Sequence, residues 1–501
     1  MTILGFQDAL GEVERHVDVV IVGSGPGGSA AARVLARGGR SVLVLEEGPA
    51  QHRFRPAMTH TMRYHMQEGG SMVALGHAPV SVAAGRGIGG GSLINSAICW
   101  RAPSDILDGW TEVIGEDAFS AARMAPAYDD VGARIGVTRT SEDIAGENNL
   151  LIVRGAKKLG LEADLLHRNA PQCVGCGVCN FGCPSGGKWS VDRTLLADAR
   201  DAGAVVQADV KVDRVLVEGE RAAGVSGEVR DPDTGAPVGR LTVHAKQVVL
   251  AAGAVGTPRL LHHAGLADLL GPRLGQGLHL HPGNAVMALC DHEVKMWTGA
   301  TQGAYFADPA LPGVLPHTLT LPPGALLIAL GGAGAGVKEN IALASRMTGC
   351  VVMVSDKGEG SVSADANGFA KMNYAFAPVD IDNMRKGMKR TCEVLLAGGA
   401  SRLFLPIHKA GFVDGIDEAF RIIDAADLRD YQALYAAHPM ATCRIGRDRI
   451  SSVCGPSGEA HGLPGLFIAD ASVFPTSLGV NPQWTTMAMA TLIAGRVLAA
   501  A

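Results

Sequence analysis

The sequence is short of aromatic residues and has no strong excess of charge of either sign. Aromatic residues make up 5% of the 501 residues, and the formal net charge is -5. Nucleic-acid-binding proteins carry a basic patch or stripe, so the composition gives no basis for a nucleic-acid partner. Hydrophobic residues make up 47%, which is enough to form two or three domains, or one large domain with a second embedded in it.

Long apolar runs are also missing. The nearest candidate, PPGALLIALGGAGAGV at residues 322–337, is rich in glycine and has only LLIAL as an apolar centre. A membrane-spanning helix needs about 20 apolar residues. The first 16 residues lack the basic and apolar regions of a signal peptide. We therefore expect a cytoplasmic protein without a transmembrane segment.

Cysteine is scarce except in one short segment. Ten cysteines are too few for a disulfide scaffold in a chain of this length, yet four of them fall in CVGCGVCNFGC at residues 173–183. The spacing C-x2-C-x2-C-x3-C, followed by proline, is the one that bacterial ferredoxins use. It predicts an iron–sulfur cluster, either [4Fe-4S] or [3Fe-4S], on Cys173, Cys176, Cys179 and Cys183, with Cys183 left out in the second form.

Two other interpretations of the cysteine segment stay open. The thiolates could hold structural zinc, although four-thiolate zinc sites usually use two C-x2-C pairs that lie farther apart. They could also be buried thiols or local disulfides without a catalytic role. Either outcome would remove the one-electron centre from the predicted protein.

Residues 17–48, VDVVIVGSGPGGSAAARVLARGGRSVLVLEEG, predict a nucleotide site. The segment reads as a buried strand, a glycine-rich turn, a helix and a second buried strand. Gly23, Gly25 and Gly28 form G-x-G-x-x-G, which allows a tight turn, a close approach to a pyrophosphate and close packing of helix on strand. The helix start favours phosphate charge. Glu46 then stands where a carboxylate accepts ribose hydroxyls, with Glu47 as its rival, in a site for NAD or FAD.

Further elements follow from apolar patterning. Residues 203–256 are rich in strands, and the last of these, QVVLAAGA, is apolar throughout like a central strand of a parallel sheet. A helix is predicted to start at Pro258, and a long one near residues 382–400. Residues 462–500 predict a strand, a loop and an apolar helix.

Five blocks in a fixed order give the chain a specific resemblance. They are the G-x-G-x-x-G unit, GRGIGGGSLIN at 85–95, GAVGTPRLLHHAGL at 253–266, HPMATCRIG at 438–446 and IADASVFPTSLGVNPQWTTMAMA at 468–490. The chain resembles the glucose–methanol–choline (GMC) oxidoreductases, a family of flavoproteins. The third block departs mildly from the family, with Ala264 where serine is usual and Ala267 in place of a final glycine.

The resemblance implies FAD as the nucleotide and an α/β fold. A Rossmann-type FAD-binding domain would span residues 1–285, with a cysteine-rich insertion near 165–190. An embedded α+β substrate-binding domain would span 286–433, where the match is weakest. Residues 434–501 would return to the FAD-binding domain with the catalytic residues.

The resemblance also implies roles for single residues. His438 would be the general base for the hydroxyl proton, since a neutral imidazole accepts a proton near pH 7, and Asn481 would orient the oxygen. The cofactor residues would divide into those that hold the ADP half, Gly23, Gly25, Gly28 and Glu46; those that line the flavin, Gly89, Gly90 and Asn95; the adenine contact, Val212; and those that close the site, Ala252 and Asp470.

The implied function is FAD-dependent oxidation of an alcohol to an aldehyde or ketone by hydride transfer to flavin N5. The cysteine segment resembles that of the long-chain alcohol oxidases and suggests the iron–sulfur-bearing GMC dehydrogenases. It favours a dehydrogenase that passes electrons through the cluster to an external acceptor such as a quinone, a cytochrome or another carrier. An oxidase that forms hydrogen peroxide, a hydroxynitrile-lyase-like flavoprotein and an electron-transfer subunit are the alternatives. The low charge, together with the resemblance to the long-chain alcohol oxidases, favours an apolar or aromatic-substituted primary alcohol.

Overall fold

The predicted nucleotide-binding unit forms as a strand, a helix and a second strand. The computed structural model describes residues 3–50, 55 and 57–500. β2 (Gly11–Val22) leads into α1 (Pro26–Arg37) and then β3 (Val42–Leu45), and the two strands pair in parallel. The apolar ends of both strands are fully buried, as expected for a sheet covered on both faces. This part of the prediction is confirmed.

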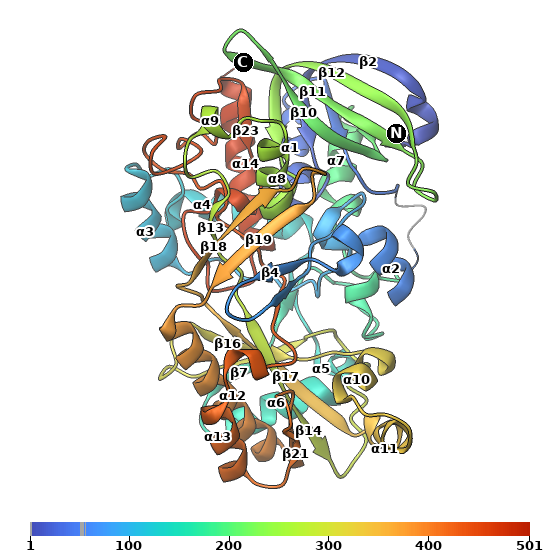
Figure 1. Ribbon diagram of the computed structural model, residues 1–501, viewed down its shortest axis with the longest axis vertical. Coiled ribbons are helices and arrows are strands. Elements are labelled where there is room, and N and C mark those ends of the chain that lie inside the picture. The colour runs from blue at the N-terminus through green and yellow to red at the C-terminus, as the bar shows by residue number, and fades with distance from the viewer. Residues whose placement is uncertain (1–2, 51–54, 56, 501) are drawn as a thin grey trace.

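The first sheet contains this unit and occupies the upper half of the molecule (Figure 1). β12 (Pro237–Leu250) lies at its centre and pairs in parallel with β2 and with β23 (Leu466–Ile468). The predicted central strand is therefore confirmed. The strand order is β1 (Ile3–Leu4), β9 (Val205–Gln207), β3, β2, β12, β11 (Arg221–Arg230) and β10 (Val210–Glu218).

The second sheet extends from the middle of the molecule to its lower half (Figure 1). Several of its strands precede residue 286 in the sequence. The predicted domain limits at 285 and 433 stay a prediction. The strand order is β13 (Gln276–Leu278), β18 (Glu359–Ala364), β19 (Ala370–Ala375), β4 (Val73–Leu75), β5 (Val80–Val82), β22 (Tyr435–Ala436), β14 (Gly283–Cys290), β17 (Met347–Val354), β16 (Val314–Thr318), β15 (Ala304–Ala307) and β7 (Glu162–Leu165), and β20 (Ala400–Leu405) joins β14 to β21 (Gly411–Val413). β6 (Thr138–Arg139) and β8 (His167–Arg168) pair separately.

Helices cover both sheets. The predicted long helix is α12 (Pro378–Gly398), and the C-terminal apolar helix is α14 (Gln483–Ala499), which packs on α1. The other helices are α2 (Met58–His65), α3 (Ser104–Ile114), α4 (Ala121–Arg134), α5 (Glu142–Ala145), α6 (Glu147–Lys158), α7 (Leu195–Asp201), α8 (Gly253–His263), α9 (Ala267–Leu270), α10 (Pro323–Leu330), α11 (Ala335–Ala344) and α13 (Ile416–Ala425).

One predicted helix start is wrong. α8 begins at Gly253, so Pro258 lies inside the helix instead of at its first turn. A proline at this position leaves the carbonyl four residues earlier, that of Ala254, without its helical partner. The hydroxyl of Thr442 donates to that carbonyl at 2.7 Å. A residue distant in sequence therefore supplies the hydrogen bond that the proline cannot make.

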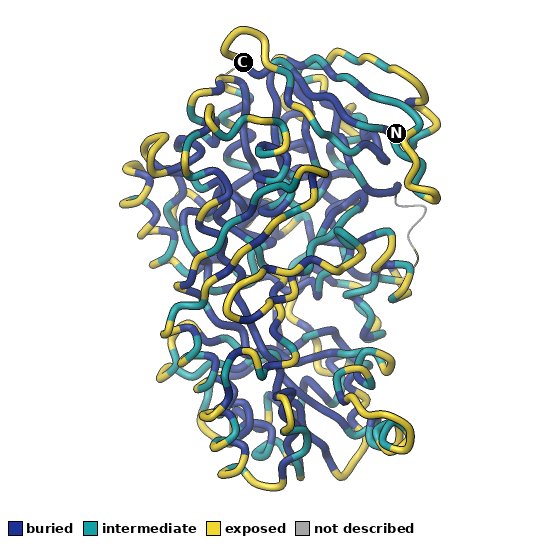
Figure 2. Tube along the Cα trace, in the orientation of Figure 1, coloured by how far each residue is buried: buried dark blue, intermediate teal, exposed yellow. Residues whose placement is uncertain are grey.

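The buried core follows the two sheets. One cluster of buried apolar side chains surrounds the first sheet and α14, and another lies between the second sheet and α12. Figure 2 shows this buried interior in dark blue along both halves of the molecule. In the described part of the chain, no helix is both long enough and apolar enough to span a membrane.

Candidate active site

A cavity of about 830 Å³ lies where the two sheets meet. Its wall combines the glycine turn of the first sheet with strands of the second. The predicted residues that line it are Gly23, Gly25, Glu46, Gly90, Asn95, Val212, Ala252, His438, Asp470 and Asn481. Gly28 and Gly89 do not reach the cavity. The tertiary structure therefore brings most of the predicted cofactor residues together with the predicted catalytic pair.

Gly28 and Gly89 shape the site from behind its wall. A β-carbon on Gly28 would lie 1.9 Å from the carbonyl oxygen of Gly23, so only glycine lets α1 pack so closely on the turn. Gly89 has a φ of 110°, a conformation that favours glycine. It places Gly90 against Gly25, where a β-carbon on Gly90 would lie 2.7 Å from the α-carbon of Gly25. The two glycine loops thus meet backbone to backbone at the cavity.

Glu46 holds these loops together. Its carboxylate accepts hydrogen bonds from the amide and hydroxyl of Ser24 at 3.1 and 2.7 Å, from the Gly48 amide at 3.0 Å and from the Gly87 amide at 2.9 Å. Burial raises the pKa of Glu46 although these bonds oppose it. Its rival Glu47 is instead paired with Arg259, at 3.3 Å. The arrangement favours Glu46 as the residue that sets the nucleotide end of the site.

Asp470 closes the opposite side of the glycine turn. One carboxylate oxygen accepts from the Gly253 amide at 2.9 Å and from the Thr257 hydroxyl at 2.6 Å, and the other accepts from the Ser472 amide at 2.8 Å. Burial raises the pKa of Asp470. The carboxylate thereby fixes the start of α8 beside the cavity.

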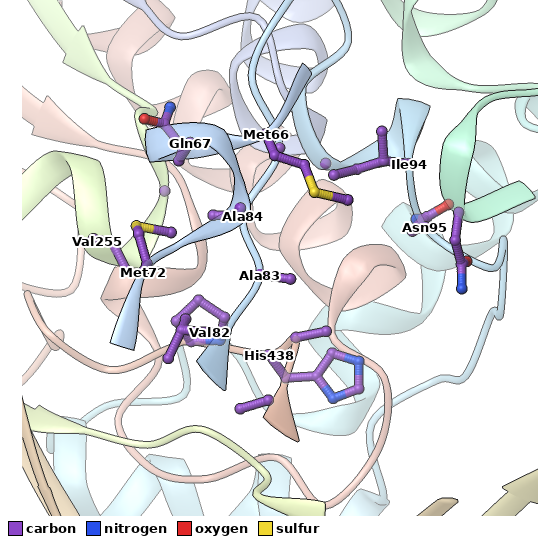
Figure 3. A pocket seen from close by; sticks show the side chains of 18 of the residues that line it. Met66, Gln67, Met72, Val82, Ala83, Ala84, Ile94, Asn95, Val255 and His438 are labelled. Atoms are coloured by element: carbon purple, nitrogen blue, oxygen red, sulfur yellow. The ribbon is translucent and has the colours of Figure 1, made fainter. Parts of the chain in front are cut away.

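Asn95 lines the cavity and contacts the start of α14. Its amide nitrogen donates to the side-chain oxygen of Gln483, the first residue of α14, at 2.8 Å. Figure 3 shows Asn95 and His438 at the same cavity, with Ile94 nearby. The residues present fit FAD. Two glycine loops, held in place by the carboxylates of Glu46 and Asp470, leave backbone exposed to the cavity for a nucleotide, and the same cavity is lined by His438.

His438 and Asn481 meet as the motifs imply. Nε2 of His438 lies 3.1 Å from Nδ2 of Asn481. His438 follows the short strand β22, whereas Asn481 precedes Pro482 at the start of α14. The two residues thus come from different elements and converge on the cavity. Their catalytic roles stay a prediction.

Two further histidines, which the sequence analysis left out, lie beside this pair. Nδ1 of His281 lies 3.3 Å from Nδ1 of His438, and the Gly479 amide donates to Nε2 of His281 at 2.9 Å. His317 on β16 also lines the cavity, and its Nε2 has no hydrogen-bond partner in the described part of the chain. A candidate signal for His281 is its place in LHLHP, but alternation of histidine with leucine occurs in any half-buried strand.

The histidines of this cluster are held neutral. Burial lowers the pKa of His281 and of His317 to about 4. Burial, together with His281 and His317, holds the pKa of His438 well below its usual range. A neutral imidazole is the form that can accept a proton, so His438 is in the protonation state that its predicted role requires.

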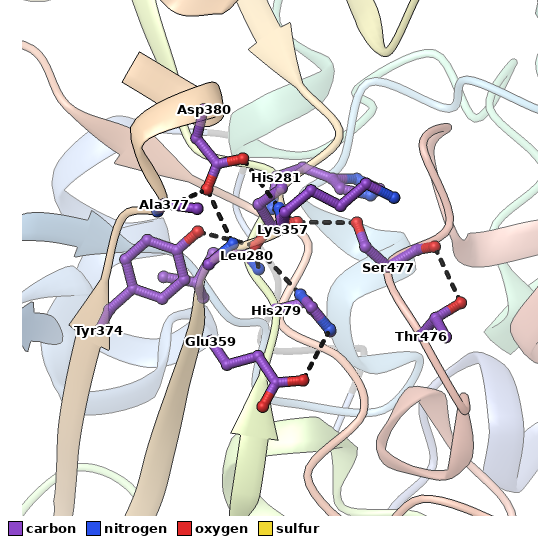
Figure 4. A network of polar contacts seen from close by, with 12 residues as sticks. His279, Leu280, His281, Lys357, Glu359, Tyr374, Ala377, Asp380, Thr476 and Ser477 are labelled. Atoms are coloured by element: carbon purple, nitrogen blue, oxygen red, sulfur yellow. Dashed lines mark hydrogen bonds and ion pairs between the residues drawn. The ribbon is translucent and has the colours of Figure 1, made fainter. Parts of the chain in front are cut away.

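Asp356 fixes the backbone around His281. Its buried carboxylate accepts from the Leu280 amide at 2.8 Å, the Tyr374 hydroxyl at 2.8 Å and the Ser477 hydroxyl at 2.7 Å. Figure 4 shows Leu280, Tyr374 and Ser477, which come from separate segments, close to one another. Burial would raise the pKa of Asp356, but histidine neighbours and these hydrogen bonds outweigh it and hold the pKa well below its usual range. The carboxylate therefore stays charged and ties His281, which has a φ of 49°, into place.

The cysteine segment gives the predicted cluster no support. The guanidinium of Arg168 donates to the sulfur of Cys173 at 3.7 Å and to that of Cys179 at 3.2 Å, and the Lys188 amide donates to Cys183 at 3.2 Å. No group of three or more His, Cys, Asp or Glu within the described ranges could hold a metal ion. A cation stands between two of the predicted ligands, so the residues as arranged do not fit an iron–sulfur cluster or zinc.

Two buried cations, Lys188 and Arg168, instead link the cysteine segment to the loop at residues 89–95 and its neighbour Ser96. We call residues 89–95 the flavin loop, because the family resemblance places them at the flavin. Nζ of Lys188 donates to the carbonyls of Leu93, Asn95 and Cys179 at 2.8–3.0 Å, and Arg168 donates to the Ser96 carbonyl at 2.9 Å. Burial lowers the pKa of Lys188 to about 8. All ten cysteines are free thiols. The segment therefore acts as a wall behind the loop at residues 89–95.

Comparison with known proteins decides the family. Models described as GMC oxidoreductase match residues 62–283 and 356–490, and a NAD(P)-binding Rossmann-like domain matches residues 21–50. The chain belongs to the GMC oxidoreductase family. It therefore has the GMC fold, with a Rossmann-like FAD-binding domain and a substrate-binding domain, and it is an FAD-dependent oxidoreductase that acts on CH–OH groups.

Curated relatives span most of the chain. An uncharacterized GMC-type oxidoreductase of Mycobacterium tuberculosis is 34% identical over 488 residues, which cover 97% of this chain and 76% of the relative. Long-chain-alcohol oxidase FAO3 of Arabidopsis thaliana is 29% identical over 517 residues, which cover 96% of this chain and 67% of the relative. The resemblance to long-chain alcohol oxidases is thereby confirmed.

Solved GMC structures share the fold at low identity. Pyridoxine 4-oxidase from Mesorbium loti has a TM-score of 0.72 at 18% identity, with 95% of this chain and 98% of that chain covered. Formate oxidase from Aspergillus oryzae has a TM-score of 0.72 at 16% identity, with 97% and 98% covered. At this identity the likeness bears on the fold alone.

Proposed function

We propose that this GMC oxidoreductase oxidises an apolar primary alcohol to the aldehyde, with molecular oxygen as the acceptor for the reduced flavin. One observation carries the alcohol chemistry: Nε2 of His438 lies 3.1 Å from Nδ2 of Asn481. Both residues line the cavity that the predicted nucleotide-binding residues also line. A cytoplasmic location is part of the same proposal.

His438 and Asn481 would divide the work on the substrate hydroxyl. Bound FAD supplies the acceptor for the hydride of the alcohol carbon. His438, neutral in this environment, takes the hydroxyl proton, and the Asn481 amide holds the oxygen beside it. His281 fixes the His438 ring from the far side. Removing the proton as the hydride leaves gives the aldehyde.

The wall beyond the catalytic pair supports an apolar substrate. The side chains there carry no charge, and their character suits a hydrocarbon chain that excludes water from the reacting carbon. They include Met287, Leu319, Leu321, Ala325, Ile328, Val351 and Met353. The likeness to long-chain-alcohol oxidases supports the same substrate class.

Oxygen is proposed because the described cysteine side chains, as arranged, do not converge on a common metal site, so the geometry gives no support for one-electron transfer through a cluster. The curated relatives include a long-chain-alcohol oxidase. An exit through an iron–sulfur cluster is therefore left out of the proposal. A flavin that reacts with oxygen directly needs no second redox centre.

An anaerobic substrate screen tests the proposal. Primary alcohols of increasing chain length are mixed with the FAD-loaded protein, and reduction is read from the flavin absorbance. We expect long-chain alcohols to bleach the flavin, and admission of air to restore it with one hydrogen peroxide per flavin. Slow reoxidation by air but rapid reoxidation by a quinone would show a dehydrogenase. An unbleached flavin combined with cleavage of a cyanohydrin would show a lyase.

A further inference from the structure

An apolar hairpin of two helices borders the cavity. α10 and α11 are joined by a glycine-rich turn, and Nδ2 of Asn340 donates to the Gly331 carbonyl across the hairpin at 2.8 Å. The hairpin lies at the lower right of the molecule (Figure 1). It contains PPGALLIALGGAGAGV, the most nearly continuous apolar run in the sequence.

α10 and the turn that follows it carry no charged side chain, and α11 carries Lys338 and Glu339. No Asp, Glu, Lys or Arg occurs between Asp308 and Lys338. α10 is apolar on all sides, which is typical of a helix that is buried or that contacts lipid. A surface helix of a water-exposed domain normally carries charged residues on its outer face.

One side of α10 packs against other residues that the structure describes. Leu326 and Leu330 are buried and pack in a cluster with Met287 and Leu319. On the outer side, Ile328 is 77% exposed, and Ile341 on α11 is 57% exposed. Figure 2 shows much of the hairpin as exposed or intermediate. Exposed apolar side chains on both helices of one hairpin favour an interaction surface there.

The exposed helix is also part of the cavity wall. Ala325, Ile328 and Ala329 line the cavity. Because Ile328 both lines the cavity and is exposed, α10 stands at its mouth. The outer apolar surface of the hairpin is therefore continuous with the apolar interior that ends at His438.

We propose that the α10–α11 hairpin docks on the hydrocarbon surface of a lipid layer, so that an apolar alcohol held in that layer enters the cavity past α10. Delivery of the alcohol rests on the proposed function, whereas docking does not. A lipid surface fits better than a protein, because protein interfaces use arginine and frequent hydrogen bonds, and the outer face here offers only Lys338, Glu339 and Asn340 as polar side chains. Insertion of exposed isoleucines at the lipid boundary needs neither.

Flotation with vesicles tests the docking. The FAD-loaded full chain is mixed with phosphatidylcholine vesicles, and the bound fraction is measured without any substrate. We expect the wild type to float with the vesicles, and Ile328→Glu and Ile341→Glu to lower the partition coefficient at least about tenfold. Ile450→Glu is the matched control, since Ile450 is 79% exposed in a turn outside the hairpin. It should float like the wild type.

Several outcomes would overturn the proposal. Wild-type protein that stays unbound, or an equal loss in the Ile450 variant, would do so. Binding that requires anionic lipid and disappears between about 0.1 and 1 M salt would point to charge instead of apolar contact. A dimer that Ile328→Glu converts to a monomer would make the hairpin a subunit interface. Flavin absorbance and unchanged thermal unfolding show that each variant is folded, and reduction by short soluble alcohols tests the proposed function separately.

Discussion

Nδ1 of His281 lies 3.3 Å from Nδ1 of His438, and the two rings meet edge to face. Only one of these nitrogens can carry a hydrogen in such a contact, because two facing N–H groups would repel. The contact therefore orients the ring of His438 and disfavours its fully protonated form. Burial of both rings acts in the same direction.

Replacing His438 should strongly lower turnover without releasing the cofactor. His438→Ala removes the group that takes the hydroxyl proton, and loss of a general base typically lowers the rate by about 10²- to 10⁴-fold. FAD should remain bound, because the nucleotide end is held by Glu46 and Asp470 on other segments. Flavin reduction in a stopped-flow instrument and the flavin-to-protein ratio measure the two effects. A variant that loses FAD would show that His438 has a structural role.

The pH dependence should show a base that stays neutral in mild acid. A free histidine titrates near pH 6.5, but burial and the neighbouring imidazoles lower the pKa of His438. Since activity requires the neutral ring, kcat/KM should remain level from about pH 8 to about pH 6 and fall only at lower pH. His281→Asn removes one lowering neighbour and should move this fall to higher pH. His461→Asn, a half-buried histidine bonded to Ser452, is the control and should leave the profile in place.

Asp356→Asn should destabilise the protein. The variant replaces a buried carboxylate that accepts several hydrogen bonds, and a hydrogen bond to a charged group contributes about 1.5–3 kcal/mol. We expect the free energy of unfolding to fall by about 3 kcal/mol, measured by urea denaturation at pH 7.

The pH dependence of this loss follows from the low pKa of Asp356. A carboxyl whose pKa is lowered on folding stabilises the native state above its unfolded pKa of about 3.9, and this contribution disappears as the pH falls further. The difference between wild type and Asp356→Asn should therefore be full at pH 7 and shrink below about pH 4. A difference that does not change with pH would show that the carboxyl is not charged in the native state.

Iron and acid-labile sulfide should be absent from protein purified without oxygen. The sulfurs of Cys173 and Cys179 face Arg168 instead of a shared metal site. Because Cys176 then has no cluster to ligate, Cys176→Ser should leave flavin reduction and reoxidation unchanged. Lys188→Met should instead lower FAD retention, because Lys188 bonds to carbonyls of the flavin loop. Stoichiometric iron that Cys176→Ser removes would restore the cluster and the dehydrogenase mechanism.

The sequence by itself determined the elements whose signals are local. G-x-G-x-x-G between two apolar strands specifies the turn, the helix and the position of Glu46, because each feature depends on residues within about thirty positions. The motifs around His438 and Asn481 likewise identified the family and its cofactor. The C-x2-C spacing is equally local, but a metal site needs thiolates that converge in space, so the cluster stays a prediction that the arrangement of the described cysteines does not support.

Only the tertiary structure decided what surrounds these motifs. His281, His317 and Asp356 come from different strands of the second sheet and its connections, and long-range strand pairing, not sequence spacing, brings them to His438. The exposure of the outer apolar face of α10 also depends on the tertiary structure. The pattern predicts an apolar segment, but whether neighbouring strands cover each side depends on the packing of the whole chain.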